Sequence, residues 1–227
     1  MPGILEVIVT SVDEARKAEA GGADRLELVR SLECGGLTPD LALARKVIQS
    51  VSIPVRVMVR ESDSIATGDD PELEALRARA AKAACLPVDG LVLGFVRDGK
   101  IDRDATVWVL HAVPEIRATF HRAFDEVTDP LHAIDDLKEI GQIDRILTNG
   151  GPGDWPLRKR RLLEWQRVAS PQIAIIVAAG LCPLALEELS KETVPFEFHV
   201  GRAARLGHQV SNPVDSSQVA SVKAMIR

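Results

Sequence analysis

The feature that most constrains the fold of this chain is the alternation of short apolar runs with helical segments along its 227 residues. Each run is rich in Val, Ile and Leu and too short for a buried helix, so it predicts a buried strand. The predicted strands are Ile4–Val9, Arg25–Val29, Pro54–Arg60, Asp89–Phe95, Ile116–Phe120, Arg145–Thr148, Ile173–Ala178 and Phe196–Val200.

Helix start and stop signals separate these runs. Ser11–Glu14 has the pattern of a capping box, and the helix it opens is expected to stop at Gly21-Gly22. Thr38-Pro39 and Asp129-Pro130 each have the pattern of an N-cap followed by a first helical position. Asp98-Gly99 indicates a turn. The other predicted helices run from Thr38 to Ser50, Pro71 to Cys85, Asp102 to Val113, Pro130 to Ile140, Pro156 to Val168, onward from Pro183, and from Asp215 to Ile226.

Eight strand–helix units without a linker or a break in composition predict parallel strands that are covered on both faces. Eight units in this length are typical of a single (β/α)8 TIM barrel, an α/β fold, spanning residues 1–227 as one domain. The competing arrangement is a doubly wound open sheet. That fold usually has fewer strands and often a G-x-G-x-x-G turn after the first one, which this sequence lacks.

Composition narrows the class of partner. Lys and Arg number 28 against 33 Asp and Glu, for a net charge of −5, and no basic stripe occurs, so no nucleic-acid partner is expected. No apolar run is long enough to span a membrane, and the N-terminus enters a strand without the features of a signal peptide. Cys34, Cys85 and Cys182 form no paired motif, so we expect a cytoplasmic protein in which each cysteine is a small buried hydrophobe.

In a TIM barrel the chemistry lies at the C-terminal ends of the strands. In this sequence those ends carry Glu6, Glu27, Arg60, His121, Thr148 and His199, together with Gly94, Gly180 and Gly201. Charged residues inside apolar strands are informative because burying an unpaired charge is costly. Glu6 and Glu27 are therefore expected to point into the barrel, with Arg60 or Arg56 as a partner.

Each of these residues also has a purely structural interpretation. Glu6, Glu27 and an arginine could form a buried ion-pair network, or they could surround a small ligand together with a histidine of shifted pKa. His121 could be a satisfied core histidine, although Arg122 and Asp125 beside it favour a site. Gly180 and Gly201 could be turn glycines, or they could offer backbone N–H groups to a phosphate.

Several segments together resemble the CutC copper-homeostasis protein family. The matching segments are Leu5–Val7, Ala20–Leu28, Gly35–Pro39, Ile53–Arg60, Asp89–Gly94, Thr119–Asp125, Arg145–Thr148 and Glu197–His199. The resemblance implies a cytoplasmic (β/α)8 barrel that forms a homo-oligomer, a dimer or a tetramer, and that binds copper.

The chain departs from this family at positions that matter for metal binding. The resemblance implies that members that bind copper carry one cysteine in the first strand and another in the second. This chain has Ile8 and Val29 at those positions. Cu(I) prefers thiolate or thioether ligands, so Cys34 is the candidate that could replace them. The loop after Arg60, Glu61 to Ile65, also differs from the glycine-rich loop of the family.

Three functions remain open from the sequence. The first is copper homeostasis through a copper ion bound at Cys34. The second is an enzyme for a small anionic or phosphorylated substrate. Its catalytic residues would be Glu6, Glu27, Arg60, His121 and His199, and its substrate-binding residues Arg122, Asp125, Thr148, Gly180 and Gly201. The third is a scaffold whose barrel serves an oligomer. We expect Glu6, Glu27, Arg60 and His121 to converge at one end of the barrel.

Overall fold

A computed structural model of the chain describes residues 3–64, 66, 68–179 and 181–226. Over these residues eight parallel strands close into a barrel in the order β1-β10-β9-β8-β7-β4-β3-β2. The predicted TIM-barrel fold is therefore confirmed, and the predicted strands are all present with bounds shifted by a few residues. The barrel strands are β1 (Ile4–Val9), β2 (Arg25–Leu28), β3 (Val55–Met58), β4 (Gly90–Leu93), β7 (Arg117–Phe120), β8 (Ile143–Thr148), β9 (Ala174–Val177) and β10 (Glu197–Val200).

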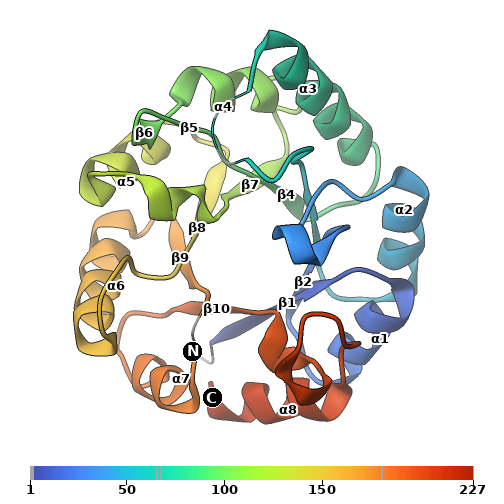
Figure 1. Cartoon of the computed structure of the whole chain (residues 1–227), viewed down its shortest axis with the longest axis vertical. Coiled ribbons are helices and arrows are strands. Elements are labelled where there is room, and N and C mark those ends of the chain that lie inside the picture. Colours follow the sequence, from blue (N-terminus) through green and yellow to red (C-terminus); the bar gives the residue numbers. More distant parts are fainter. Residues whose placement is uncertain (1–2, 65, 67, 180, 227) are drawn as a thin grey trace.

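The α-helices form a ring outside the strands, and both chain ends lie near α7 and α8 (Figure 1). The ring consists of α1 (Val12–Ala20), α2 (Leu41–Ser50), α3 (Asp70–Ala84), α4 (Arg103–Leu110), α5 (Pro130–Lys138), α6 (Trp155–Ala169), α7 (Pro183–Ser190) and α8 (Ser216–Met225). Short 3-10 helices are η1 (Leu32–Cys34), η2 (Arg122–Glu126), η3 (Arg202–Ala204) and η4 (Leu206–His208). None of the helices in the described part of the chain combines the length and the apolar character needed to cross a bilayer.

The helix starts follow the predicted caps with one exception. Ser11 accepts a hydrogen bond from the backbone N–H of Glu14, and Asp129 accepts one from that of His132. The predicted N-cap at Thr38 is wrong, because Asp40 caps α2 by accepting from the N–H of Leu43. The hydroxyl of Thr38 instead bonds both backbone groups of Arg60, which ties the loop after β2 to the end of β3.

A two-stranded hairpin was not predicted. β5 (Val96–Arg97) and β6 (Lys100–Ile101) pair antiparallel between β4 and α4. The turn that joins them is the predicted Asp98-Gly99, and both residues have positive φ, which Asp and Gly tolerate better than most residues.

The barrel strands bury both faces. Alternate residues point outward to the helices, and in β1 these are Leu5, Val7 and Val9, which belong to the main core. The inward face has two parts: an apolar layer toward the strands' C-terminal ends and polar side chains below it. The apolar layer contains Ile8, Val29, Met58 and Val92, and Leu147, Ile176 and Ala178 form a further buried cluster.

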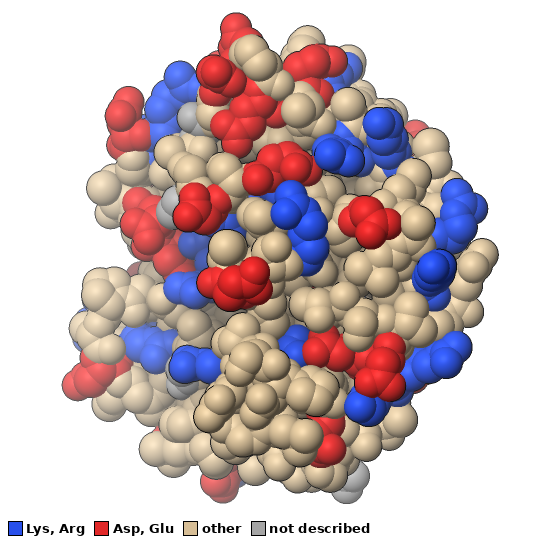
Figure 2. Space-filling model, turned by 45° about the vertical axis from the view of Figure 1, so that its right-hand side comes forward, with Lys and Arg blue, Asp and Glu red and all other residues tan. Residues whose placement is uncertain are grey.

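The outer surface carries charges of both signs. Figure 2 shows Lys and Arg side chains interspersed with Asp and Glu over the face in view, without a continuous basic area on that face. This pattern agrees with the slightly negative net charge of −5.

Candidate functional site

Three polar side chains meet inside the barrel. Glu6 of β1, Glu27 of β2 and His199 of β10 each place a ligand-type atom within 4.8 Å of the others, and they form the metal-capable cluster found in the described part of the chain. The strand register brings them together, since Glu6 pairs with His199 on one side and Arg25 on the other. Nδ1 of His199 lies 2.8 Å from Oε1 of Glu6 and 3.5 Å from Oε2 of Glu27. We call these three residues the Glu–Glu–His cluster.

Glu6 pairs with Arg25 in the structure, and not with Arg60 or Arg56 as expected. Arg25, the first residue of β2, donates from Nε to Oε2 of Glu6 at 2.5 Å and also bonds Glu197. Arg56 turns instead to Asp89 and Asp144, at 2.8 and 2.7 Å. The side chain of Arg60 bonds loop carbonyls at the mouth of the barrel, so the expected pairing of Arg60 with Glu6 or Glu27 is wrong.

Arg25 links the cluster to a chain of ion pairs that continues through the lower half of the barrel. Glu197 bonds Arg145 at 2.8 Å, and Arg145 bonds Asp144, which is shared with Arg56. With the cluster, the chain contains five carboxylates against three guanidiniums and one imidazole. The carboxylates are Glu6, Glu27, Asp89, Asp144 and Glu197. Even with His199 protonated, one negative charge is therefore in excess.

Among these five carboxylates, Glu27 is the one without an arginine partner in the described residues. This side chain is almost fully buried, and its Oε2 has no hydrogen-bond partner within the described residues. Burial, with the charge of Glu6 adding to it, raises the pKa of Glu27 to about 7 against the attraction of His199. A buried carboxylate oxygen without a donor is costly and needs either a proton or a cation.

The pKa values of Glu6 and His199, the neighbours of Glu27, are shifted in the directions that favour their charged forms. Burial alone would raise the pKa of Glu6, but Arg25 and His199 outweigh it and hold that pKa well below the usual range. Burial alone would lower the pKa of His199, but Glu27 and Glu6 outweigh it and raise that pKa above 6.5. The cluster thus holds an ionised Glu6, a basic imidazole and a carboxyl that can carry a proton, which are the groups needed for metal binding or proton transfer.

Arg60 and His121 lie elsewhere. Both line a small pocket at the C-terminal mouth of the barrel, and neither Glu6 nor Glu27 lines it. Along their strands, Ile8 and Met58 lie two residues beyond Glu6 and Arg56, so the apolar layer comes between the cluster and the mouth. The structure therefore brings Glu6, Glu27 and His199 together, and separately Arg60 and His121. The expectation that Glu6, Glu27, Arg60 and His121 converge is wrong.

The predicted substrate-binding residues form a third group at the ends of β7 and β8. Asp125 accepts from Oγ1 of Thr148 at 2.6 Å and from the backbone N–H of Asn149 at 3.0 Å. Its other oxygen accepts from Nε of Arg122 at 2.9 Å. These bonds use both oxygens of Asp125, which gives it a structural role between η2 and β8.

Of the two glycines predicted to bind substrate, Gly180 and Gly201, the structure describes Gly201. A Cβ on Gly201 would come within 3.2 Å of Ile8, so Gly201 allows the end of β10 to approach the apolar layer. Gly180 lies outside the described residues.

The cysteines are exposed, and the expectation that they are buried is wrong. Cys34 belongs to η1, where its backbone carbonyl accepts from Arg60. Its thiol is not part of the Glu–Glu–His cluster. A copper site at Cys34 would therefore need ligands from outside this cluster.

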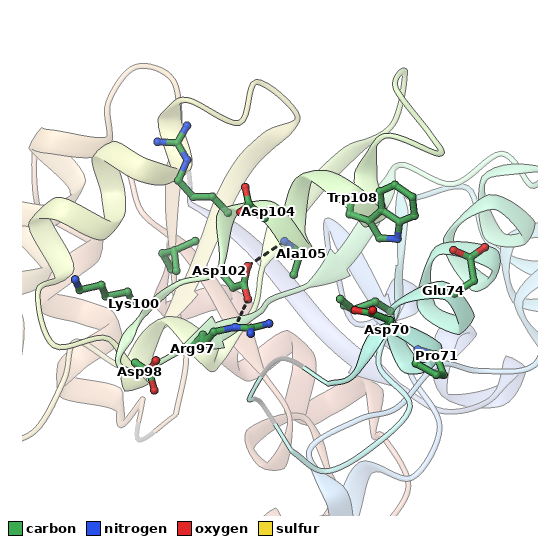
Figure 3. A pocket seen from close by; sticks show the side chains of 13 residues that line it. Asp70, Pro71, Glu74, Arg97, Asp98, Lys100, Asp102, Asp104, Ala105 and Trp108 are labelled. Carbon is green, nitrogen blue, oxygen red and sulfur yellow. Dashed lines mark hydrogen bonds and ion pairs between the residues drawn. The ribbon is translucent and has the colours of Figure 1, made fainter.

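A wide groove of about 1510 Å³ lies outside the barrel. It runs between the start of α3, the β5–β6 hairpin and α4, and Trp108 stands at one side of it (Figure 3). Asp102 in this groove caps α4 and pairs with Arg97 at 2.8 Å (Figure 3). None of the predicted site residues lines the groove.

Sequence reasoning missed Arg25, Glu197, Asp144 and Arg145. A usable signal was present, because Arg25 and Glu197 each stand two residues before a predicted site residue of the same strand. Residues at this spacing share one face of a strand, so polar residues there indicate a polar barrel interior.

Comparison with known proteins shows a consistent family. A profile of the CutC family matches residues 3–204. A copper homeostasis protein cutC homolog of Homo sapiens is 36% identical over 201 residues, covering 86% of this chain and 72% of the human protein. A family protein CutC of Photobacterium profundum is 32% identical over 210 residues, covering 91% of this chain and 84% of the relative.

Solved structures agree with these relatives. A CutC structure from Streptococcus agalactiae has a TM-score of 0.79 at 26% identity and covers 88% of this chain and 98% of that one. Phosphoribosyl anthranilate isomerase from Thermococcus kodakaraensis has a TM-score of 0.62 at 17% identity and covers 99% of each chain. At that identity, the likeness to the isomerase shows the barrel fold alone.

Proposed function

The chain belongs to the CutC family, and from this membership we propose that it acts in copper homeostasis by binding divalent copper at the Glu–Glu–His cluster. It is a homologue of copper homeostasis proteins. The copper ion is its cargo, held by Glu6, Glu27 and His199 inside the barrel.

The observation that carries this proposal is the unpartnered Oε2 of Glu27 within the described residues. This oxygen lies 3.5 Å from Nδ1 of His199, which in turn lies 2.8 Å from Oε1 of Glu6. Two carboxylate oxygens and an imidazole nitrogen therefore face one another where a buried oxygen lacks a donor. Small movements of these side chains would let all three bind one ion.

Charge supports the same site. The ion pairs around the cluster leave one carboxylate in excess, so a cation would be attracted and would remove the cost of burying that charge. Arg25 would fix the orientation of Glu6 through its bond at 2.5 Å, as partners outside the ligand shell do in metal sites.

The donor atoms favour the divalent state. Cu(I) prefers sulfur ligands, whereas nitrogen and oxygen ligands suit Cu(II), which binds such sites more tightly than the other common divalent ions of its row. The family resemblance implies cysteines at the positions that hold Ile8 and Val29 in this chain, and Cys34 is exposed on η1. These residues make a thiolate site for Cu(I) the weaker alternative.

A competition titration would test this function. Metal-free protein would be titrated with Cu²⁺ against a chelator of known affinity, and electron paramagnetic resonance would report the bound ion. We expect one Cu²⁺ per chain, with nitrogen coupling from a single imidazole. Glu27→Gln and His199→Gln should abolish tight binding, and the matched control Cys34→Ser should retain it.

A titration with Cu(I) under anaerobic, reducing conditions would separate the alternatives. Tight Cu(I) binding that Cys34→Ser abolishes, with Cu²⁺ binding unaffected by His199→Gln, would overturn the Glu–Glu–His proposal. Zn²⁺ binding tighter than Cu²⁺ binding would remove the link to copper.

A further inference from the structure

A small pocket lies at the mouth of the barrel, apart from the Glu–Glu–His cluster. The small pocket there has a volume of about 20 Å³, and its lining includes Val59, Arg60, Glu61, Gly94, Phe95 and His121. Ser64 and Ala66, both exposed, form its solvent side. We propose that this pocket binds the carboxylate head group of a small organic acid, through N–H donors of Arg60 and His121.

His121 is held as a hydrogen-bond donor. Its Nδ1 accepts from the backbone N–H of Ala123 at 3.1 Å, so Nδ1 carries no proton and the ring hydrogen is on Nε2. The ring packs over Gly94, where an added Cβ would lie 2.6 Å from Nδ1. The cap and this packing fix the ring, which leaves Nε2–H as the group that can bind a ligand.

Arg60 has an unused donor in the same lining. Its terminal nitrogens bond the carbonyls of Cys34 and Gly36 at 3.3 Å and of Asp63 at 2.5 Å. Its Nε is buried and has no acceptor in the described part of the chain. A buried N–H without an acceptor is costly, so this atom marks a position for an oxygen from a ligand.

The electric field at the pocket favours an anion. Burial, and then the charges of Arg60 and Arg122, lower the pKa of His121 to about 3. His121 is therefore a neutral donor at physiological pH, and the charges that act on it most are those of Arg60 and Arg122.

The two acids of the lining have partners of their own, although Oε1 of Glu61 is buried without a hydrogen bond among the described residues. Glu61 lies 3.3 Å from both Arg30 and Arg79, and Glu72 accepts from the hydroxyl of Ser62 at 3.2 Å. Arg60 has no carboxylate partner among the described ion pairs, so neither acid cancels its charge by direct pairing. They also make the pocket unfavourable for a doubly charged ligand.

Size and donor number select the ligand class. A volume of about 20 Å³ is little more than the roughly 10–15 Å³ that one water needs, so at most a small head group can enter and the rest of a ligand would stay outside. Two free N–H donors match the two oxygens of a carboxylate. A phosphate would need more donors and would bring a second negative charge toward Glu61 and Glu72.

This site is independent of the copper cluster. Glu6, Glu27 and His199 do not line the pocket, and the apolar layer of Ile8, Val29, Met58 and Val92 lies between the two. Failure of one proposal therefore leaves the other standing.

Nuclear magnetic resonance of metal-free protein with labelled histidine rings would test the site. Acetate and glycolate would be titrated at constant ionic strength, with inorganic phosphate as the comparison probe. We expect a saturable shift of the His121 Nε2–H signal with both carboxylates. Arg60→Met and His121→Asn should weaken binding by about tenfold or more, as loss of a charge-assisted or buried hydrogen bond does.

The variants are chosen to keep the proposal falsifiable. Asn at position 121 can still accept from the N–H of Ala123 but has no Nε2–H, so it tests the donor while the cap is kept. Arg97→Met removes an exposed arginine of the β5–β6 hairpin and should leave binding unchanged. Carboxylate shifts that do not saturate, phosphate binding tighter than acetate, or equal loss in Arg97→Met would overturn the proposal.

Discussion

Nδ1 of His199 lies 3.5 Å from Oε2 of Glu27, and that oxygen has no hydrogen-bond partner in the described part of the protein. A buried carboxylate is thus held beside a basic imidazole without a bond that satisfies it. Groups that serve only the fold are usually paired when they are buried. We therefore expect Glu27 to lower the stability of the metal-free protein and to favour binding of a ligand.

The first prediction is that Glu27→Gln stabilises the metal-free protein. The change removes the surplus negative charge and keeps the size of the side chain, so unfolding at pH 8 should cost about 1–3 kcal/mol more. Urea unfolding followed by circular dichroism, in the presence of a chelator, measures it. Cu²⁺ should raise the stability of the wild type and leave that of Glu27→Gln unchanged.

Glu6→Gln is the matched control. The same substitution at the neighbouring carboxylate leaves Arg25 with one partner fewer, so it should destabilise the protein. If both variants shift the free energy of unfolding in the same direction, the charge surplus does not reside on Glu27.

The second prediction concerns Arg25. Arg25→Met leaves Glu6 and Glu197 buried without this guanidinium, which should cost about 3–5 kcal/mol of folding stability. Arg97→Met, which removes the ion pair of the exposed Arg97 side chain with Asp102, should cost less than about 1 kcal/mol in the same urea assay. Equal costs would mean that burial of Glu6 and Glu197 without Arg25 carries no extra penalty.

Much of the barrel could be predicted because its signals are local. A run such as Ile4–Val9 can bury both faces only as an interior strand, and Ser11 or Asp129 can satisfy the free N–H groups of a helix start. The start of α2 was misplaced because Thr38 and Asp40 are both good caps, and contact with Arg60 decides between them. The strands β5 and β6 are too short to show a period.

The site could be predicted only in part. Glu6, Glu27 and His199 are recognisable as charged or polar residues in apolar strands. The partner of Glu6 is not, because the choice of Arg25 over Arg60 depends on the register in which Glu6 of β1 stands beside Arg25 of β2. That register is set by how the strands pair when the barrel closes, so it cannot be read from the sequence of any one strand.

The third prediction concerns the close approach of Gly94, the residue after β4, to His121. Gly94→Ala would place a Cβ 2.6 Å from Nδ1 of His121, so the ring must move and the bond to Ala123 must weaken. We expect a loss of about 1–3 kcal/mol, as for overpacking in a core, together with a shifted His121 ring signal. Gly141→Ala, where no atom lies within 4 Å of the added Cβ, should change neither.

The fourth prediction is a pH dependence. Burial and Arg60 lower the pKa of His121 from 6.5 to about 3, so the unfolded chain takes up a proton below pH 6.5 that the folded protein does not. This contribution to stability is complete above pH 6.5 and is lost as the pH falls toward 3. Between pH 7.5 and 4.5 the wild type should lose about 2–3 kcal/mol that His121→Asn does not lose.

Urea unfolding at the two pH values gives the four free energies needed. Asn keeps an acceptor for the N–H of Ala123, so the variant should fold, and only the proton linkage is removed. His132→Asn is the control, because it makes the same substitution at a histidine of α5 whose side chain is 68% exposed. If His121→Asn retains the wild-type slope, the imidazole is protonated in the folded protein, and its Nδ1 cannot be the acceptor that fixes the ring at the mouth of the barrel.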